Sequence, residues 1–525
     1  MQRTFASLAE QDFDLFVCGG GIYGAWTAYD AALRGLQVAI VDQGDWASGT
    51  SSASSKLIHG GLRYLQTHDF KLVRKALTER EMLLQAAPHR VWPLRFGIPV
   101  YQDSRFNRLQ LKAGLFLYDL LGSNKQASEG HCYFSRQQFA EKYPRLDASS
   151  LVAGFTYADA QTDDVRLVLE LIDGAQQAGA VCVNYCEVLR YQEAGVQVYG
   201  VVVKDRVSGE VVNVSARQVV NTTGRWMTEL KQVRPWCRLS KGIHIVLPKV
   251  LGRDALLLTA KADGRVFFMI PWYGLTLVGT TDSNYSDDLD RLTVEKDEID
   301  YLLSEANHFF PGANWTQEDI LGQFAGLRVL RQSAQASPAS ISRDWELKTL
   351  GNGMHVSLGG KITSAREDAA SIVDSVVKQL GVNQICTTRG KDFPWKPSET
   401  YLQWCGKQLD QARRLGIDRE SADWLIKRHG AHTDRIFRLI EDQADLAQRI
   451  IPGLPFIQAD LVFCAQHEMV VHLEDLLRRR IPLFILAKIS LSELRELAEM
   501  ASHVLGWADA RTHAEVELCR QQWLH

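Results

Sequence analysis

A glycine-rich turn between a short apolar stretch and a predicted helix limits what this chain can fold into more than any other feature. Residues 14–18 are Asp-Leu-Phe-Val-Cys, and three glycines follow in GxGxxG spacing at Gly19, Gly21 and Gly24. We expect residues 25–34 to form a helix. Glycines at these positions let a pyrophosphate approach the backbone, and the helix N-terminus offers free N–H groups. By itself, the pattern is also typical of an ordinary turn between a strand and a helix.

The residues after this helix favour a dinucleotide site. A second apolar strand is predicted over residues 37–41, and it ends at Asp42, eighteen positions beyond Gly24. An acid at that distance usually accepts a hydrogen bond from a ribose hydroxyl. The same acid disfavours a 2′-phosphate, so the pattern predicts FAD or NAD rather than NADP.

The bulk composition excludes several classes of protein. The 525 residues suffice for two or three domains, and 46% hydrophobic with 23% charged residues is usual for a soluble globular protein. A net charge of −3 gives no indication of nucleic-acid binding. The nine cysteines include no CxxC pair, which favours reduced thiols in the cytosol over disulfides or a metal site. Residues 1–13 lack a signal-peptide core, and no apolar run is long enough to predict a membrane span.

A run of small hydroxyl residues at 48–55 continues directly into Lys56-Leu57-Ile58-His59-Gly60-Gly61-Leu62-Arg63-Tyr64. A serine-rich run is also found in flexible linkers and polar surface loops. Hydroxyl side chains beside a Gly-Gly pair suit a loop that lies flat against a large planar cofactor, and this is the interpretation we favour.

The middle of the chain predicts many short strands. Those at 181–188, 196–205, 210–214 and 217–220 form an antiparallel meander that ends at Asn221-Thr222-Thr223-Gly224. Such a meander after a first Rossmann-like unit is expected of FAD proteins of the glutathione-reductase type. Four further strands predict a separate antiparallel sheet that could carry substrate groups over the cofactor: 244–247, 255–259, 266–270 and 275–280.

A second strand–glycine–helix unit occurs late in the chain. A strand over 354–358 leads to Gly359-Gly360-Lys361, and a helix is predicted over 364–380. The N–H groups of this turn and Lys361 could face the flavin pyrimidine and stabilise negative charge on the reduced ring. The alternative is an ordinary surface lysine at the start of a helix.

Two helical regions invite functional interpretations. Residues 104–121 place an apolar stripe beside Arg105, Arg108 and Lys112, which fits either a helix packed on the core or an interfacial helix on anionic lipid. Residues 400–525 are predicted to be almost entirely helical. Their Cys464, His467, Glu468 and His472 could suggest a metal site, but without a second ligand cluster we interpret them as polar helix positions and predict no metal.

Five motifs together resemble the FAD-dependent, quinone-linked glycerol-3-phosphate dehydrogenases. They are Gly19-Gly20-Gly21-Ile22-Tyr23-Gly24, the segment from Thr50 to Leu65, Lys241-Gly242-Ile243-His244-Ile245-Val246, Gly279-Thr280-Thr281-Asp282 and Gly359-Gly360-Lys361-Ile362-Thr363. The segment 464–480 looks like the C-terminal helical domain of that family, so the resemblance spans almost the whole chain.

The resemblance implies an α/β fold of three parts. The first is a glutathione-reductase-type FAD-binding Rossmann domain built from residues 12–95, 151–240 and 341–390. The second is an antiparallel-sheet substrate cap, as in D-amino-acid oxidase, built from 96–150 and 241–340. A C-terminal all-α domain would cover 391–525.

The resemblance also implies a reaction: hydride transfer from C2 of sn-glycerol 3-phosphate to FAD, giving dihydroxyacetone phosphate, with electrons passed to a membrane quinone. The implied catalytic residues are His244, Arg328 and Lys361, and those for substrate binding are Arg63, Tyr64, Arg343 and Thr363. Cofactor contacts are expected from Gly19, Gly21, Gly24, Asp42, Thr50, Ser51, Ser55, Lys56, His59, Gly60, Gly61, Thr223, Gly224, Gly359, Gly360 and Lys361. For His59 we favour packing in its loop over a covalent flavin link.

Partners and location follow from the same resemblance. We expect a cytoplasmic protein, peripheral on the inner face of the cytoplasmic membrane through residues 104–121, with no nucleic-acid partner; a homodimer is left open. Val329 replaces the family's usual proline after the first arginine, and Ala365 replaces a common tyrosine. Two alternatives therefore stay open: a flavin oxidase of an amine or 2-hydroxy acid, and a catalytically silent FAD-binding homologue.

Overall fold

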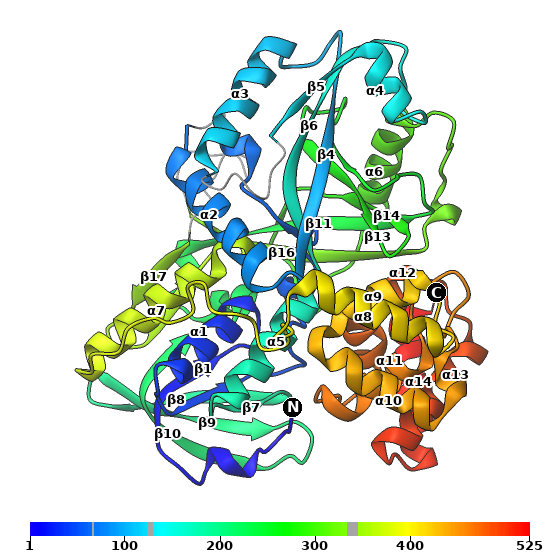
Figure 1. Cartoon of the computed structure of the whole chain (residues 1–525). Coiled ribbons are helices and arrows are strands. Elements are labelled where there is room, and N and C mark those ends of the chain that lie inside the picture. Colours follow the sequence, from blue (N-terminus) through cyan, green and yellow to red (C-terminus); the bar gives the residue numbers. More distant parts are fainter. Residues whose placement is uncertain (66–67, 123–129, 333–344, 525) are drawn as a thin grey trace.

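The computed structural model describes every residue except 66–67, 123–129, 333–344 and 525. It contains two sheets that lie one above the other and a helical C-terminal domain beside them (Figure 1). The strands that carry the glycine fingerprint belong to the lower sheet in this view.

The nucleotide-binding sheet has a parallel centre, as expected of a Rossmann-like unit. Its path runs β17 (Glu346–Thr349), β18 (His355–Leu358), β10 (Val211–Asn221), β1 (Phe13–Cys18), β2 (Val38–Val41) and β7 (Val181–Val183). Strands β18, β10, β1, β2 and β7 pair in parallel in this order. Three helices lie on this sheet: α1 (Ile22–Leu33), α5 (Asp164–Gln177) and α7 (Ala365–Leu380). Their apolar faces and the strands form one buried core.

The meander differs from the prediction at two places. The predicted strand 181–188 is interrupted, because Tyr185 adopts a left-handed conformation with φ of 51°, and β8 (Cys186–Ala194) then turns to pair with β9 (Gln197–Asp205). The predicted strands 210–214 and 217–220 are one strand, β10. Its first half pairs antiparallel with β9, and its second half pairs in parallel with β1. The prediction left a gap at Ser215 and Ala216, but the change of partner occurs there without a break in the strand.

The second sheet follows the path β15 (Ser283–Tyr285), β11 (Cys237–Leu247), β14 (Leu275–Gly279), β13 (Val266–Trp272), β12 (Ala255–Thr259), β4 (Val91–Tyr101), β6 (Leu151–Thr162) and β3 (Leu57–Ile58). Strand β16 (Gly322–Arg331) pairs with β11, and β5 (Cys132–Ser135) pairs with β6. The sheet is antiparallel except where β12 meets β4. Residues 151–162, which the expected division assigns to the FAD-binding domain, thus hydrogen-bond within this sheet.

Strand β4 was not predicted because it contains two prolines. A proline cannot donate to a neighbouring strand, so an interior strand seldom holds one. Here β12 pairs with β4 only at Phe96 and Gly97, and Pro93 and Pro99 lie on either side of that short contact. The prolines, which lack an N–H group, therefore remove no hydrogen bond between β4 and β12.

The helices agree more closely with the sequence. Helix α2 covers Phe70–Ala86. Helix α3 (Arg108–Leu121) begins four residues later than predicted, because Asn107 forms a capping box with Gln110. The cap also contains α4 (Arg136–Lys142) and α6 (Lys296–Phe309).

The C-terminal domain is helical as predicted: α8 (Tyr401–Arg414), α9 (Arg419–His429), α10 (Thr433–Asp442), α11 (Gln458–His467), a π-helical segment (Asp475–Arg480), α12 (Leu483–Leu486), α13 (Leu491–Leu505) and α14 (Asp509–Trp523). In the described part of the chain, none of the helices is both long and apolar enough to traverse a bilayer.

Candidate active site

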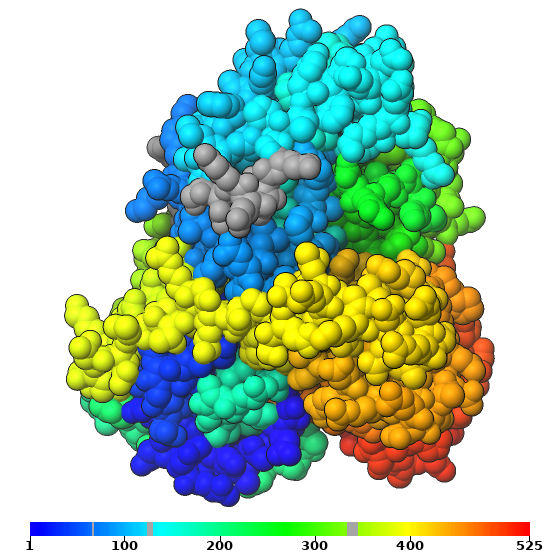
Figure 2. Space-filling view, in the orientation of Figure 1, coloured from blue at the N-terminus to red at the C-terminus, as the bar shows by residue number. Residues whose placement is uncertain are grey.

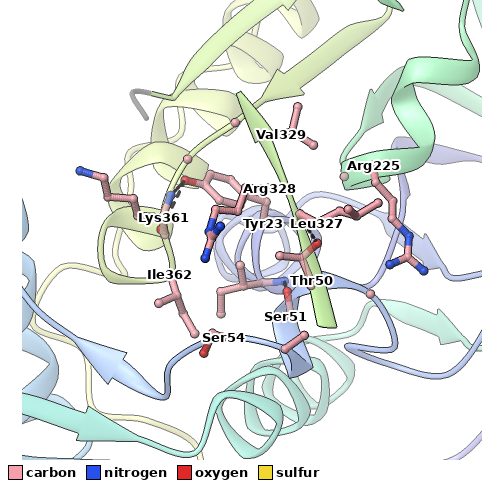
Figure 3. A pocket seen from close by; sticks show the side chains of 18 of the residues that line it. Tyr23, Thr50, Ser51, Ser54, Arg225, Leu327, Arg328, Val329, Lys361 and Ile362 are labelled. Atoms are coloured by element: carbon pink, nitrogen blue, oxygen red, sulfur yellow. Dashed lines mark hydrogen bonds between the residues drawn. The ribbon is translucent and has the colours of Figure 1, made fainter. Parts of the chain in front are cut away.

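A cavity of about 1220 Å³ lies between the two sheets. This volume exceeds the roughly 300–1,000 Å³ of common small-molecule pockets, so a dinucleotide and a small substrate can share it. Its lining comes from the carboxyl ends of β1 and β2, the serine-rich loop, β11, the residues directly after β14, β16 and the turn before α7 (Figure 3). Most of the residues predicted to form the site meet here: Gly19, Gly21, Asp42, Thr50, Ser51, Ser55, His59, Gly61, Arg63, Tyr64, Thr223, Gly224, His244, Arg328, Gly359, Gly360 and Lys361.

One end of the cavity has the form of a nucleotide cradle. Gly19 has a φ of 101°, and a Cβ there would lie 2.8 Å from the Thr222 carbonyl oxygen. The Asp42 carboxylate accepts hydrogen bonds from Gly20 N at 2.6 Å and Gly44 N at 2.9 Å, and burial raises its pKa to about 6. Each carboxylate oxygen has a further lone pair, so Asp42 can still accept from a ribose hydroxyl. The residues present therefore fit a dinucleotide.

The serine-rich loop closes over the start of α1. Ser51 Oγ accepts a hydrogen bond from Ile22 N at 2.9 Å, which satisfies one of the free N–H groups of that helix. Thr50 Oγ1 donates to the Leu327 carbonyl oxygen on β16 at 2.6 Å. These two bonds connect the loop to α1 and to β16, and Figure 3 shows Thr50 beside Leu327.

Tyr23 connects the two glycine-rich turns, which are more than three hundred residues apart. Gly360 has a φ of 101°, and a Cβ there would lie 1.8 Å from Tyr23 Oη. Lys361 N donates to this oxygen at 2.9 Å, and the Tyr23 hydroxyl donates to Asp368 at 2.7 Å. The turn at Gly359-Gly360-Lys361 is thereby held against α1, at the same cavity as the first fingerprint.

The basic residues form two groups on this cavity instead of one. The Lys361 ammonium lies 3.8 Å from the centre of the Tyr64 ring, and the Arg63 guanidinium lies 5.1 Å from the same ring. Arg328 projects from β16 and donates to Thr280 Oγ1 at 2.8 Å. Figure 3 shows the Lys361 side chain directed away from Arg328.

His244 lies buried on β11 beside Arg328. Its Nε2 is 2.9 Å from Ser55 Oγ, and its ring stacks on Phe324 with centroids 5.0 Å apart. Gly279 on the paired strand leaves room for the ring, because a Cβ there would lie 2.3 Å from His244 Cδ2. Burial, followed by the positive charges of Arg328 and Lys56, lowers the pKa of His244 well below its ordinary value. The ring is therefore neutral at physiological pH and able to accept a proton.

Four predicted site residues do not line the cavity, and each has a structural contact instead. A Cβ at Gly24 would lie 1.8 Å from the Gly19 carbonyl oxygen, so this glycine permits close helix packing. The Lys56 ammonium is buried against Asp164 at 2.6 Å. Gly60 N donates to Tyr118 Oη at 2.9 Å, and Thr363 Oγ1 accepts from His59 N at 3.1 Å. The last predicted residue, Arg343, lies outside the described residues.

Several residues that line the cavity were not predicted. Thr280, Thr281 and Asp282 surround Arg328, although only their motif was noted in the sequence. Arg225 and Trp226 line the nucleotide end, with the guanidinium 4.2 Å from the indole ring. Their position could have predicted them, because they directly follow Thr223-Gly224, and the strand before these small residues ends at the site.

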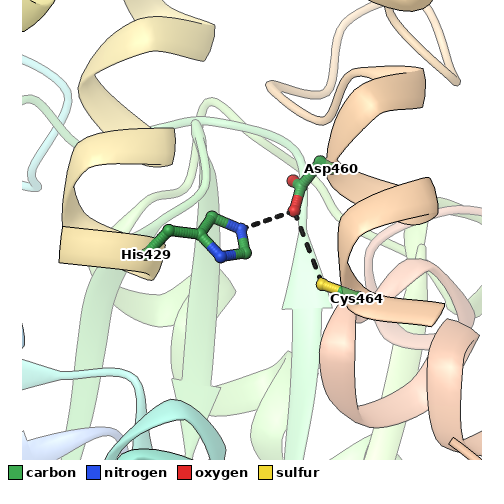
Figure 4. Close-up of side chains that lie close together, drawn as sticks. All are labelled: His429, Asp460 and Cys464. Atoms are coloured by element: carbon green, nitrogen blue, oxygen red, sulfur yellow. Dashed lines mark hydrogen bonds and ion pairs between the residues drawn. The ribbon is translucent and has the colours of Figure 1, made fainter. Parts of the chain in front are cut away.

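A second group of titratable side chains lies in the C-terminal domain. His429 Nε2 is 2.7 Å from Asp460 Oδ1, and Cys464 Sγ is 3.7 Å from the same oxygen (Figure 4). These three residues have the spacing of metal ligands. However, Arg428 contacts Asp460 at 2.8 Å and Arg166 contacts His429 Nδ1 at 3.1 Å. The Arg428 guanidinium already pairs with the Asp460 carboxylate, Arg166 occupies the second ring nitrogen of His429, and burial keeps the pKa of the Cys464 thiol well above its ordinary value, so these groups disfavour a cation.

Comparison with known proteins identifies the family. Residues 14–366 match the family of FAD dependent oxidoreductases, and residues 395–512 match the C-terminal domain of alpha-glycerophosphate oxidase. A glycerol-3-phosphate dehydrogenase of Synechocystis is 35% identical over 98% of this chain and 97% of its own length. The aerobic glycerol-3-phosphate dehydrogenase of Staphylococcus saprophyticus is 31% identical over 97% and 93%.

A solved structure extends this likeness to three dimensions. The glycerol-3-phosphate dehydrogenase of Bacillus halodurans, determined in complex with FAD, superposes with a TM-score of 0.81 at 28% identity, over 99% of this chain and 96% of that one. The fold expected from the sequence, an FAD-binding α/β domain with a sheet cap and a helical C-terminal domain, is thus confirmed. The chain belongs to the FAD-dependent glycerol-3-phosphate dehydrogenase family.

Proposed function

We propose that this protein oxidises sn-glycerol 3-phosphate to dihydroxyacetone phosphate with FAD as its cofactor. One observation carries the proposal: a neutral histidine and the cationic side chains of Arg63, Arg328 and Lys361 line the same cavity as a dinucleotide cradle. An alcohol that bears a phosphate needs a proton acceptor at the hydroxyl and positive charge at the phosphate, and this cavity supplies both.

The residues that would hold FAD are already in place. Gly19, Gly21 and Asp42 would contact the dinucleotide, and the turn at Gly359-Gly360 would lie at the flavin end. FAD, when bound, supplies a two-electron acceptor for the hydride on C2 of the substrate. Lys361 N donates to Tyr23 Oη, and this bond fixes the turn before α7 at the cavity, where the cationic Lys361 side chain would stabilise negative charge.

His244 is the base of the proposed reaction. As the C2–H bond breaks with its electron pair and the C2–O bond becomes a carbonyl, the hydroxyl proton passes to the imidazole ring. The low pKa of His244 keeps the ring unprotonated before the reaction. Arg328, whose charge also lowers that pKa, lines the same cavity and would stabilise negative charge on the substrate oxygen during proton transfer.

The substrate phosphate requires fixed cations. A guanidinium presents paired N–H donors that match phosphate oxygens, whereas an ammonium acts as a point charge. We assign Arg63 and Lys361, which flank the Tyr64 ring, to the phosphate, and Arg328 to the reacting end of the substrate. Arg343 and Thr363 remain candidates from the sequence; the Thr363 hydroxyl acts in this structure by holding the His59 backbone.

Anaerobic bleaching of the bound flavin tests the proposed function directly. We expect sn-glycerol 3-phosphate to bleach the holoenzyme, while glycerol without the phosphate bleaches it far more slowly. Bleaching by an amine or a 2-hydroxy acid, together with rapid O₂ consumption, would assign a flavin oxidase instead. An oxidised flavin that no such substrate reduces would indicate a catalytically silent homologue.

We further propose that α3 places the protein on the inner face of the cytoplasmic membrane, where quinone reoxidises the flavin. The outward side chains of Leu109, Phe116 and Leu120 are 73%, 63% and 69% exposed, while Leu115 and Tyr118 hold the helix on the cap. Arg105, Arg108 and Lys112 beside them are exposed as well. Figure 2 shows this blue-to-cyan part of the cap at the end of the molecule away from the red C-terminal helices. An exposed apolar stripe with basic neighbours is typical of helices that lie in a lipid interface.

Sedimentation with lipid vesicles tests this proposal. The protein should bind vesicles that contain anionic lipid, and Leu109→Glu with Phe116→Glu should abolish binding without changing flavin reduction by substrate. Leu402→Glu, which changes an exposed leucine on α8, is the matched control. Equal binding by the double variant and the control would exclude α3 as the contact.

A further inference from the structure

The orientation of His244 depends on one hydroxyl group. The ring is 2% exposed, and Ser55 Oγ lies 2.9 Å from its Nε2. Within the described ranges of the chain, no second hydrogen-bond partner of the ring is found, and Nδ1 is buried without one. Ser55 itself lines the cavity. The polar environment of the base is therefore determined largely by where the Ser55 side chain points.

A buried ion pair beneath the loop holds Ser55 in place. Asp164, at the start of α5, accepts hydrogen bonds from Ser54 N at 3.2 Å and from Ser54 Oγ at 2.7 Å. The same carboxylate accepts from Lys56 Nζ at 2.6 Å, and Lys56 Nζ also donates to the Ser52 carbonyl oxygen at 2.9 Å. Both sequence neighbours of Ser55 are thus bonded to one carboxylate. Charge-assisted bonds of this kind are strong, so the loop cannot turn without breaking them.

We propose that Ser55, anchored by Asp164 through Ser54 and Lys56, is a positioning residue for the base His244. This inference rests on the proposed oxidation of glycerol 3-phosphate and adds a second role to a loop otherwise expected to contact the cofactor. A hydroxyl both donates and accepts. Ser55 Oγ can therefore donate to Nε2 while the ring is neutral and accept from Nε2–H once the substrate proton has been taken up at Nε2.

The charges around His244 explain why this bond matters. Arg328 faces the His244 ring from β16, and Lys56 faces it from the serine-rich loop. Phe324 covers one side of the ring. The Arg478 guanidinium lies 5.7 Å from the centre of the Phe324 ring. Asp164 is the carboxylate in direct contact with Lys56. A protonated ring beside these cations is unfavourable, so a hydroxyl that accepts from it lowers the barrier to proton transfer.

Rapid-reaction measurements on the holoenzyme test the assignment. Flavin reduction by sn-glycerol 3-phosphate would be followed anaerobically in H₂O and in D₂O for the wild type, Ser55→Ala, Ser55→Thr and Asp164→Asn. Ser371→Ala, which removes an exposed hydroxyl on α7, is the control. FAD content and the apparent Kd of the substrate would be recorded for each variant.

We expect Ser55→Ala to slow reduction by at least about tenfold, part of the roughly 10²–10⁴-fold that a general base supplies, with FAD content and substrate Kd unchanged. The solvent isotope effect should increase, because proton transfer becomes limiting. Ser55→Thr should restore most of the rate because it keeps the hydroxyl, and Asp164→Asn should slow reduction like Ser55→Ala.

Two results would overturn the inference while leaving the proposed function intact. One is a reduction rate in Ser55→Ala equal to that of Ser371→Ala, and the other is equal slowing by alanine and threonine at position 55. If the wild-type flavin is not reduced by glycerol 3-phosphate at all, the proposed function fails and the inference with it.

Discussion

The cavity and the contact between the C-terminal helices and the nucleotide-binding sheet both bury charged groups, yet only one of them is arranged for chemistry. In the contact, the Arg480 guanidinium pairs with Asp45, Arg166 pairs with Glu468 at 2.5 Å, and Arg90 pairs with Glu170 at 2.9 Å. In the cavity, His244, the proposed base, has a hydroxyl partner and cationic neighbours.

Two buried histidines make the contrast specific. His429 lies in the packed contact, where Asp460 bonds one ring nitrogen and Arg166 the other, and burial lowers its pKa to about 4. His244 also has a lowered pKa, but it lines a cavity of about 1220 Å³. A perturbed pKa by itself therefore does not mark a catalytic residue; the group must also be able to reach a substrate.

The largest expected effect comes from replacing His244, the proposed base in the cavity. His244→Asn should slow flavin reduction by roughly 10²–10⁴-fold while FAD stays bound, because the general base is lost and the cradle is unchanged. His513→Asn, an exposed change in the C-terminal domain, should have no effect on the rate. Stopped-flow absorbance of the flavin measures both. A small effect at His244 would remove the basis of the contrast between the two histidines.

Breaking an ion pair in the packed contact should lower the stability of the folded protein. Asp45→Asn leaves Arg479 and Arg480 without their shared carboxylate, and an unpaired buried charge costs about 3–5 kcal/mol. Thermal unfolding should therefore shift to a clearly lower temperature. Asp418→Asn breaks a more exposed pair with Arg449 and should cost only about 0–1 kcal/mol. Equal shifts for the two variants would show that the buried pair is not an anchor.

Substrate affinity should depend on the geometry of Arg328 as well as on its charge. Arg328→Lys keeps the charge but removes the planar fork that bonds Thr280 and faces the cavity. A lost charge-assisted hydrogen bond is worth about 1.5–3 kcal/mol, so the apparent Kd of glycerol 3-phosphate should rise on the order of 10- to 100-fold. Substrate titration of flavin bleaching measures this. An unchanged Kd would place the substrate away from Arg328.

The smallest expected effect is a pH dependence of FAD binding. Burial raises the pKa of Asp42 to about 6, so its carboxylate is ionised above this pH and increasingly protonated below it. Ribose hydroxyls donate to the ionised form. FAD affinity should thus be maintained above pH 6 and fall by up to about tenfold per pH unit below it. Fluorescence of released FAD reports the change, and Asp42→Asn should bind more weakly at pH 8 and show no step near pH 6.

The structure shows why some site residues were predictable and others were not. Gly19 and Asp42 belong to a fingerprint whose spacing is itself the signal, His244 and Arg328 were expected from the family resemblance, and the structure brings all four to one cavity. Strands β4 and β6 were not predicted, because the prolines of β4 and the uneven polar pattern of β6 do not give the regular alternation by which a strand is recognised. Their partner strands lie elsewhere in the chain. Lys56 was expected at the cofactor, whereas its ammonium is bonded to Asp164, more than a hundred residues away.

Local sequence determined the nucleotide cradle and the helix caps, because each depends on residues a few positions apart. The tertiary structure alone decided which charges are paired and which face a cavity. Tyr23 meets the turn at Lys361, and Ser55 meets His244, only because separate segments fold together. Electrostatic energies depend on distance and burial, which a linear sequence does not contain, so the division between the packed contact and the reactive cavity is a property of the fold.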